Sequence, residues 1–184
     1  MRLYRQTVED YALFSGKELS EEEWSNLLKD AGQMSAKMRA VRIVSATSVS
    51  EVDLCRRLIQ KGEDPGQAKE AVKWMSDLNL IDDRQTAEQI VSRCIAQGYG
   101  LGRAKQMLFE KRIPKQYWQE ALADYPDQSQ KIEQFLRSRL TGDSDVREVK
   151  RVIDALVRRG HSYAQIQSVM RQLDYDEIPE GEYG

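Results

Sequence analysis

One complete three-helix unit is visible in residues Leu80–Leu122, LIDDRQTAEQIVSRCIAQGYGLGRAKQMLFEKRIPKQYWQEAL. Asp83 can cap a first helix, and Gly98 and Gly100 can end it. A second helix follows, and Pro114 opens a third. Each apolar stripe has helical spacing, so each helix needs a neighbour to cover it. The positions that define the three helices are Ala87, Ile90, Val91, Cys94 and Ile95, then Ala104, Met107 and Leu108, then Tyr117, Trp118, Ala121 and Leu122.

The same unit recurs on both sides. The stop signals of the second helices, Lys61-Gly62, Lys111-Arg112 and Arg159-Gly160, follow one another at intervals of 50 and 48 residues. Three units of three short helices predict an all-α fold in which tandem repeats stack into an elongated, curved array. The outer units are defined by Met38, Val41, Val44, Leu54–Gln60, Ala68, Ala71, Val72 and Met75, and by Ile132, Phe135, Leu136, Leu140, Val146, Val149, Ile153, Leu156, Ile166, Val169, Met170 and Leu173.

These signals divide the chain. Residues 1–35 form a small N-terminal appendage, in which two short strands over residues 2–15 precede a turn at Ser15-Gly16. A capping box of Ser20 and Glu23 opens a helix there, which we expect to end near Gly32. The three repeats follow as residues 36–82, 83–126 and 127–173, and an acidic tail, 174–184, is expected to be disordered. The further helix starts are Ser50 with Asp53, Asp64-Pro65 and Ser162.

The central unit resembles the RecX family, the bacterial regulators of recombination. An ordered set of residues, rather than any one motif, carries the resemblance, which covers the central repeat best and the flanking repeats more weakly. The sequence departs from the family at Thr86, Leu101, Ala104 and Arg112, where the family has an aromatic residue, proline, a larger aliphatic residue and glycine. A left-handed Arg112 would cost energy that glycine avoids. The matching residues are Leu80–Asp83, Ala87, Arg93, Gly98–Gly100, Arg103, Lys105, Gln106, Leu108, Lys111, Ile113 and Glu120–Leu122.

The resemblance implies a non-enzymatic regulator of homologous recombination that takes part in DNA repair and the SOS response. Its partner would be the RecA filament on single-stranded DNA, bound in the helical groove, and it would inhibit the ATPase, strand-exchange and coprotease activities of RecA. No cofactor is implied. We expect a monomer in the cytoplasm. Two alternatives are a direct DNA-binding module, since three-helix units also resemble helix-turn-helix domains, and an interaction scaffold unrelated to recombination.

Basic residues cluster in the second helix of each repeat and in the turn after it. Recurrence at the same place would align their charges along one side of a stacked array, as a surface for phosphates or an acidic groove requires. The other interpretation is an ordinary solvated helix face. The predicted contact residues are Arg56, Arg57, Lys61, Arg103, Lys105, Lys111, Arg112, Lys115, Arg147, Lys150, Arg151, Arg158 and Arg159.

Composition adds limits of its own. The formal net charge is −2; residues 51–173 carry 21 bases and 18 acids, and residues 174–184 carry five acids and no base. A body so weakly positive does not predict tight, nonspecific DNA binding. No uncharged stretch approaches the roughly 18 residues of a membrane helix, and the first ten residues lack an apolar leader. The two cysteines, Cys55 and Cys94, fit reduced core residues.

No motif indicates an active site. Gly98–Gly102 superficially resembles a phosphate loop, but helices flank it, so a flexible turn is the better interpretation. The pair Asp82-Asp83 lacks further ligands for a metal and fits helix capping. His161, the only histidine, follows Gly160 and reads as a solvated loop residue, and without a second histidine the common zinc and triad patterns are excluded.

Overall fold

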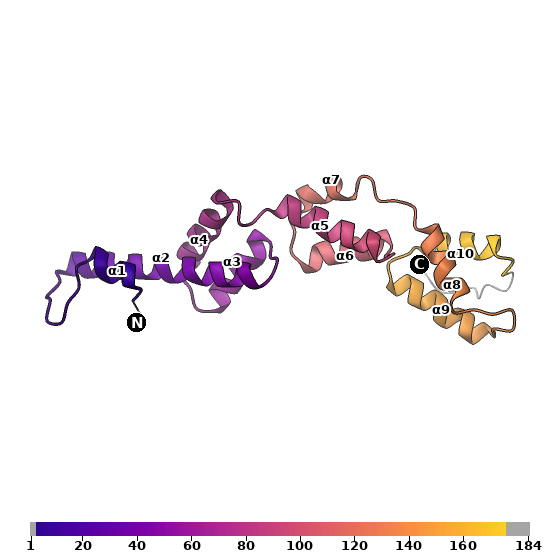
Figure 1. Ribbon diagram of the computed structural model, residues 1–184, viewed down its shortest axis with the longest axis horizontal. Helices are drawn as coiled ribbons and strands as arrows, with labels where there is room; N and C mark the ends of the chain where they lie inside the picture. The colour runs from indigo at the N-terminus through magenta and orange to yellow at the C-terminus, as the bar shows by residue number, and fades with distance from the viewer. Residues whose placement is uncertain (1–2, 176–184) are drawn as a thin grey trace. The chain divides into compact units, whose positions relative to one another are not determined.

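The computed structural model describes residues 3–175, which form ten α-helices and one short 3-10 helix and contain no strand (Figure 1). The prediction of an all-α fold is confirmed. The prediction of two short strands near the N-terminus is wrong, because this segment contains helix α1 (Arg5–Asp10). Arg5 bonds Glu9 and Gln6 bonds Asp10, and side chains four residues apart meet in a helix.

Helix α2 (Glu21–Ala46) joins the appendage to the first repeat without a break. Its predicted capping box is confirmed, since Ser20 and Glu23 exchange both hydrogen bonds. The predicted end near Gly32 is wrong. Helix α2 continues past Gly32 to Ala46, and Ala36 and Ala40 of this continuation lie in the core with α3 and α4, so packing outweighs the glycine signal. The division between residues 35 and 36 stays a prediction.

The described residues fall into two compact units that divide between Thr86 and Ala87. In the first, α2 packs with α3 (Glu51–Gln60) and α4 (Pro65–Asp77). Ser50 accepts from the Asp53 amide, and Asp64 caps α4 ahead of Pro65, as predicted. The core of this unit is Ala36, Ala40, Val49, Leu54, Leu58, Ala68, Ala71, Val72, Met75 and Ile81.

The second unit contains two apolar clusters, one for each remaining repeat. Ser162 caps the last helix in a full capping box, as predicted. Beyond that helix Tyr175 packs against the second cluster, and residues 176–184 of the predicted tail lie outside the described part of the chain. The helices of the first cluster are α5 (Asp83–Ala96), α6 (Leu101–Glu110), η1 (Lys115–Tyr117) and α7 (Trp118–Leu122), and those of the second are α8 (Ser129–Arg137), α9 (Val146–Arg158) and α10 (Tyr163–Gln172). The buried residues are Ala87, Ile90, Val91, Cys94, Ala104, Leu108 and Ile113, and then Ile132, Leu136, Leu140, Val149, Ile153, Leu156, Ile166, Val169 and Met170.

Seven of the described helices end with the same turn. In α6 the Ile113 amide donates to Leu108 O over 3.0 Å and the Arg112 amide donates to Phe109 O over 2.9 Å, which is the Schellman pattern. The residue directly after the C-cap has a left-handed backbone conformation. At Arg112, which follows the C-cap Lys111, φ is 56°. The seven left-handed residues are Ala12, Gly62, Asn79, Gly98, Arg112, Gly160 and Asp174.

This turn places one buried residue after the second helix of each repeat. Glu63, Ile113 and His161 occupy the same position, directly after the left-handed residue, and all three are buried. Ile113 joins the apolar core, whereas the Glu63 carboxylate accepts hydrogen bonds from Arg39 and Ser35 of α2. The structural equivalence of the repeats is therefore clearest at this position, although the three residues differ chemically.

The acids at the start of α5 have separate roles. Asp82 caps α5, because its carboxylate accepts a hydrogen bond from the Gln85 amide. The prediction that gave this capping role to Asp83 is therefore wrong. Asp83 is buried, and its carboxylate accepts from the Glu51 amide over 3.0 Å, at the first turn of α3. Burial raises the pKa of Asp83 to about 6. The hydrogen bond from the Glu51 amide lowers this pKa, and the negative charges of Glu51 and Asp82 raise it further. Two adjacent acids both fit a capping pattern, so the sequence could not separate them.

Arg112→Gly should raise the free energy of unfolding by about 1 kcal/mol, because glycine adopts a positive φ without the steric penalty of an L side chain. Urea denaturation monitored by circular dichroism measures this. Lys111→Gly is the matched control: Lys111 has a φ of −82°, so glycine there should destabilise. A loss of stability in both variants would contradict the assignment of strain to Arg112.

Asp83→Asn should alter the pH dependence of stability. The folded state holds the Asp83 proton more tightly than the unfolded state, so its contribution to stability is present below about pH 4 and is lost as pH rises through about 6. Asparagine keeps an acceptor for the Glu51 amide and does not titrate. The stability of the variant relative to the parent should therefore rise by on the order of 2 kcal/mol between about pH 4 and pH 7. Urea denaturation at a series of pH values measures this trend, and its absence in Asp83→Asn would contradict the raised pKa of Asp83.

Candidate functional site

The predicted basic residues lie on α3, α6 and α9 and in the segments that follow α3 and α6 or close α9. They differ in exposure, and an exposed base is better placed for an outside partner than one already held within the fold. The exposed ones are Lys61, Lys105, Arg112, Lys115, Arg147, Lys150, Arg151 and Arg158, and the half-buried ones are Arg56, Arg57, Arg103, Lys111 and Arg159.

On α3, two of the bases share one buried acid. Arg56 and Arg57 each reach the Asp53 carboxylate over 2.7 Å, and Asp53 is buried. Burial alone would raise the pKa of Asp53, but the hydrogen bonds and positive charges of Arg56 and Arg57 outweigh it and hold that pKa below its usual value. These guanidinium groups are therefore positioned by the fold, one turn or less from the acid that holds them.

On α6, the exposed charges lie toward the end of the helix and beyond it. Arg103 is half-buried and bonds Glu110 over 3.4 Å, and Gln106 donates to the same carboxylate. Arg112 and Lys115 flank Ile113 and Pro114 in the turn that leads to η1. The bases after α6 are thus presented by a short turn of fixed conformation.

On α9, Arg159 differs from the other four bases. Its guanidinium donates to Gln97 O over 2.8 Å, and its carbon lies 4.8 Å from the Tyr99 ring centroid and 5.4 Å from that of Phe135. A cation held against two aromatic faces and a carbonyl is largely engaged inside the protein. The structure gives Arg159 a role in joining the second and third repeats.

The glycine-rich segment completes this joint. The Gly100 amide donates to Arg159 O over 2.9 Å and the Gly102 amide to Gly160 O over 3.0 Å. A Cβ atom at Gly100 would collide with Gly160 O, and one at Gly160 would collide with the Arg103 main chain. The interpretation of this segment as a flexible turn is wrong, because Gly98 and Gly100 are buried and the main chains of two repeats touch there.

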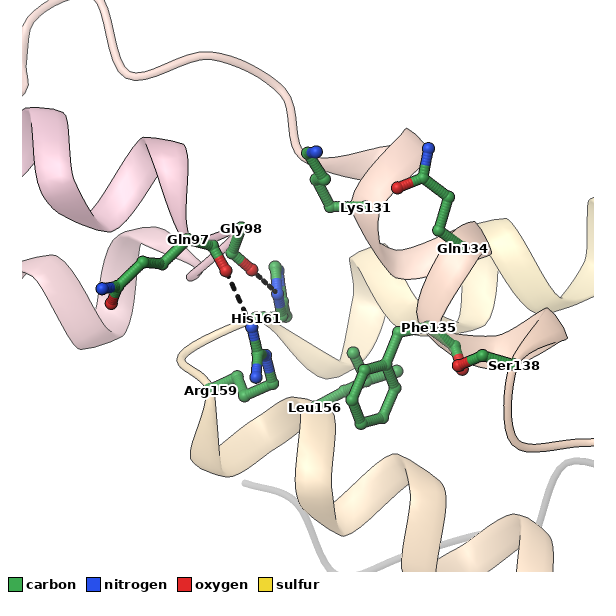
Figure 2. A pocket seen from close by; sticks show the side chains of 9 residues that line it. All are labelled: Gln97, Gly98, Lys131, Gln134, Phe135, Ser138, Leu156, Arg159 and His161. Carbon is green, nitrogen blue, oxygen red and sulfur yellow. Dashed lines mark hydrogen bonds between the residues drawn. The ribbon is translucent and has the colours of Figure 1, made fainter.

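His161 belongs to the same joint, and its prediction as a solvated loop residue is wrong. The side chain is 4% exposed, and Nε2–H donates to Gly98 O over 3.1 Å (Figure 2). Burial lowers the pKa of His161, so the ring is neutral near pH 7 and Nδ1 is unprotonated. Nδ1 has no hydrogen-bond partner among the described residues. The sequence signal that could have found this burial is the equivalence of His161 with Ile113.

A cavity of about 270 Å³ opens beside this joint. In Figure 2, Lys131, Gln134 and Phe135 of α8 lie on one side of it, and Gly98 and His161 on the other. Its polar groups are amides, cations and the Ser138 hydroxyl, which donates to Phe135 O, and its single histidine is neutral with Nε2 already bonded. This arrangement offers hydrogen bonds and positive charge, whereas a nucleophile paired with a base is not among the lining residues, which are Gln97, Gly98, Lys131, Gln134, Phe135, Ser138, Leu156, Arg159 and His161.

Residues 3–175 contain neither a candidate metal site nor a helix that could cross a membrane. No group of three or more histidine, cysteine or acidic side chains in this range could hold a metal ion. None of the helices in the same range combines the length and the apolar character that crossing a bilayer requires. Cys94 is buried and Cys55 half-buried, and both are free thiols.

Known proteins resemble this chain in sequence and in fold. No family model matches. Proteins named Regulatory protein RecX from Vibrio campbellii, Halorhodospira halophila and Clostridioides difficile are 26%, 26% and 25% identical to it over 79%, 85% and 95% of the chain, and the matches cover 96%, 100% and 85% of those relatives. A crystal structure of regulatory protein RecX aligns with a TM-score of 0.71 at 20% identity, over 92% of this chain and 88% of that one. RecX from Lactobacillus salivarius aligns with a TM-score of 0.65 at 21% identity, over 78% and 97%.

The helices and their recurring turns define the class of all-α proteins built from three-helix repeats. Within this class the chain is similar in sequence and fold to the regulatory proteins named RecX, and the resemblance inferred from residues 80–122 is confirmed. The functional role of the individual basic residues stays a prediction.

Three glycine substitutions should separate the two constraints at the joint. Gly98→Ala places an alanine at a positive φ, and its Cβ would meet only the Lys131 side chain, which can move. Gly100→Ala brings a Cβ into collision with the main chain of Gly160 but does not require a positive φ. Gly160→Ala combines a positive φ with a main-chain collision, so it should lower the free energy of unfolding most, by roughly 3 kcal/mol or more. Urea denaturation provides the ranking. Gly142→Ala, which meets nothing within 4 Å, is the neutral control, and an equal loss in all four variants would contradict the contact.

Proposed function

We propose that this chain regulates homologous recombination by binding the RecA filament assembled on single-stranded DNA. It inhibits the ATPase, strand-exchange and coprotease activities of RecA by occupying the filament groove. It does so in the cytoplasm, as a monomer, without a cofactor or chemistry of its own, within DNA repair and the SOS response. The relatives of this chain are named Regulatory protein RecX, and this name supports the proposal.

The observation that supports it most strongly is the repeated position of a base in the helix-ending turn. Lys61, Lys111 and Arg159 are the C-cap residues of α3, α6 and α9, directly before the left-handed residue. A base at a helix C-terminus also interacts favourably with the helix dipole, which explains one charge in each turn. It does not explain the further exposed bases beside the turns of α6 and α9, which are Arg112, Lys115 and Arg158. Repetition of such clusters suits a partner that is itself a repeating polymer.

The expected binding mode is a sum of modest electrostatic contacts. Each exposed base contributes little by itself, but several acting together would give an affinity that falls steeply with salt. The half-buried Arg56, Arg57 and Arg159 contribute less in this proposal, because their guanidinium groups already have partners within the fold. The exposed bases of α9 are therefore the best first targets.

The double variant Lys150→Glu/Arg151→Glu should inhibit the DNA-dependent ATPase of RecA about tenfold less effectively, because it reverses two exposed charges on α9. The amount of protein needed for half-inhibition measures this. Lys69→Glu/Lys73→Glu, two exposed bases on α4 outside the predicted set, is the matched control. Equal inhibition by the parent and the α9 variant would refute the assignment, as would an equal loss in the control.

Direct DNA binding is the second candidate, and the exposed aromatic ring of Phe109 beside the bases of α6 favours it. Titration with naked single- and double-stranded DNA, compared with co-sedimentation with the RecA filament, discriminates the two. Binding to naked DNA as tight as binding to the filament supports the second candidate.

A further inference from the structure

The end of α6 exposes an aromatic ring to solvent. Phe109 is 71% exposed, and no other large hydrophobic side chain in residues 3–175 is more exposed. It directly follows the buried Leu108 and lies about one turn before the buried Ile113, and both of these residues belong to the core. Single exposed hydrophobic side chains are common on protein surfaces, and Phe14 is 70% exposed as well, so exposure alone does not mark a binding site. The cavity and the charges beside Phe109 make it a candidate contact.

The ring borders a cavity of about 360 Å³ with a fixed wall. Trp118 also lines this cavity and is half-buried. Its indole Nε1–H donates to Ile113 O over 2.9 Å, which ties the ring to the turn after α6. A flat ligand can therefore approach Phe109 next to a second aromatic side chain whose orientation is already set. The lining residues are Phe109, Glu110, Arg112, Ile113, Lys115 and Trp118.

Positive charge surrounds this cavity. Residues 103–115 contain five bases and a single acid, Glu110. The Glu110 carboxylate accepts hydrogen bonds from Gln106 and Arg103, so its negative charge is partly neutralised by a base of the same helix. Arg112 and Lys115 are exposed and line the cavity itself. A ligand that fills it meets aromatic surface and positive charge together.

We propose that this cavity binds single-stranded nucleic acid, with one base stacked on Phe109 and the neighbouring phosphates beside Arg112 and Lys115. Stacking on an aromatic ring is available to every base, and nearby cations hold the backbone. A peptide helix would need an apolar stripe of several anchors, whereas α6 exposes one prominent ring here. The inference extends the proposed function, but its test uses DNA without RecA, so either can fail while the other stands.

The test measures binding of the full chain to a fluorescein-labelled oligothymidylate by anisotropy at low salt. Phe109→Ala should weaken binding about tenfold, since it removes the stacking surface, and Phe109→Trp should restore it. Phe14→Ala is the matched control, because Phe14 is 70% exposed and lies outside the cavity. Both phenylalanines are exposed, so neither substitution removes a core side chain.

An abasic oligonucleotide of the same length separates stacking from charge. Phe109→Ala should not alter its binding, whereas Lys115→Glu should weaken binding of both oligonucleotides. An acidic protein surface is the competing partner, and poly-glutamate is its probe. The proposal is overturned if Phe109→Ala binds oligothymidylate as tightly as the parent, or if it weakens poly-glutamate binding as much as oligothymidylate binding.

Discussion

The left-handed residue that closes the helices is the constraint on which this structure depends. A helix leaves its last carbonyl groups without partners, and the Schellman turn satisfies them with the amides of the two residues that follow. It also reverses the direction of the chain within a few residues. The seven described helices that end in this turn can therefore pack against their neighbours with brief connections, and most of their stability comes from that packing. After each second helix, the turn determines three consecutive positions: the C-cap, the left-handed residue and the buried residue that follows it.

The buried residue after each second helix shows how one position serves different purposes. Ile113 extends an apolar core, Glu63 forms an ionic and hydrogen-bonded link to α2, and His161 bonds Gly98 of the preceding repeat. Burial is the common requirement, and each side chain meets it with a different partner. The bases beside these turns divide in the same way. Some are exposed and available to a partner, and others, such as Arg159, hold the fold together.

Most of the helices were predictable from sequence because their signals are local. The caps at Ser20, Ser50, Asp64 and Ser162 are side-chain to main-chain bonds within one turn, and the sequence shows both groups. The misassigned features depend on contacts distant in sequence. Helix α2 continues past Gly32 because its later residues Ala36 and Ala40 pack with α3 and α4, and His161 is buried and bonds Gly98 of another repeat. Of the candidate site, the sequence predicted only a recurring set of basic residues. Some of these bases are held within the fold by acids or aromatic rings such as Asp53 and Tyr99, and those contacts appear only in the structure.

The joint between the second and third repeats combines two main-chain hydrogen bonds with the side chains of Arg159 and His161, and glycine stands at the points of closest approach. Each contact needs its own residue: a Cβ atom at Gly100 or Gly160 would collide with the opposite main chain, and Arg159 and His161 each donate to a carbonyl of the preceding repeat. Exposed bases such as Lys150 and Arg151 take no part in these contacts. Their charges can therefore be changed without removing any bond of the joint.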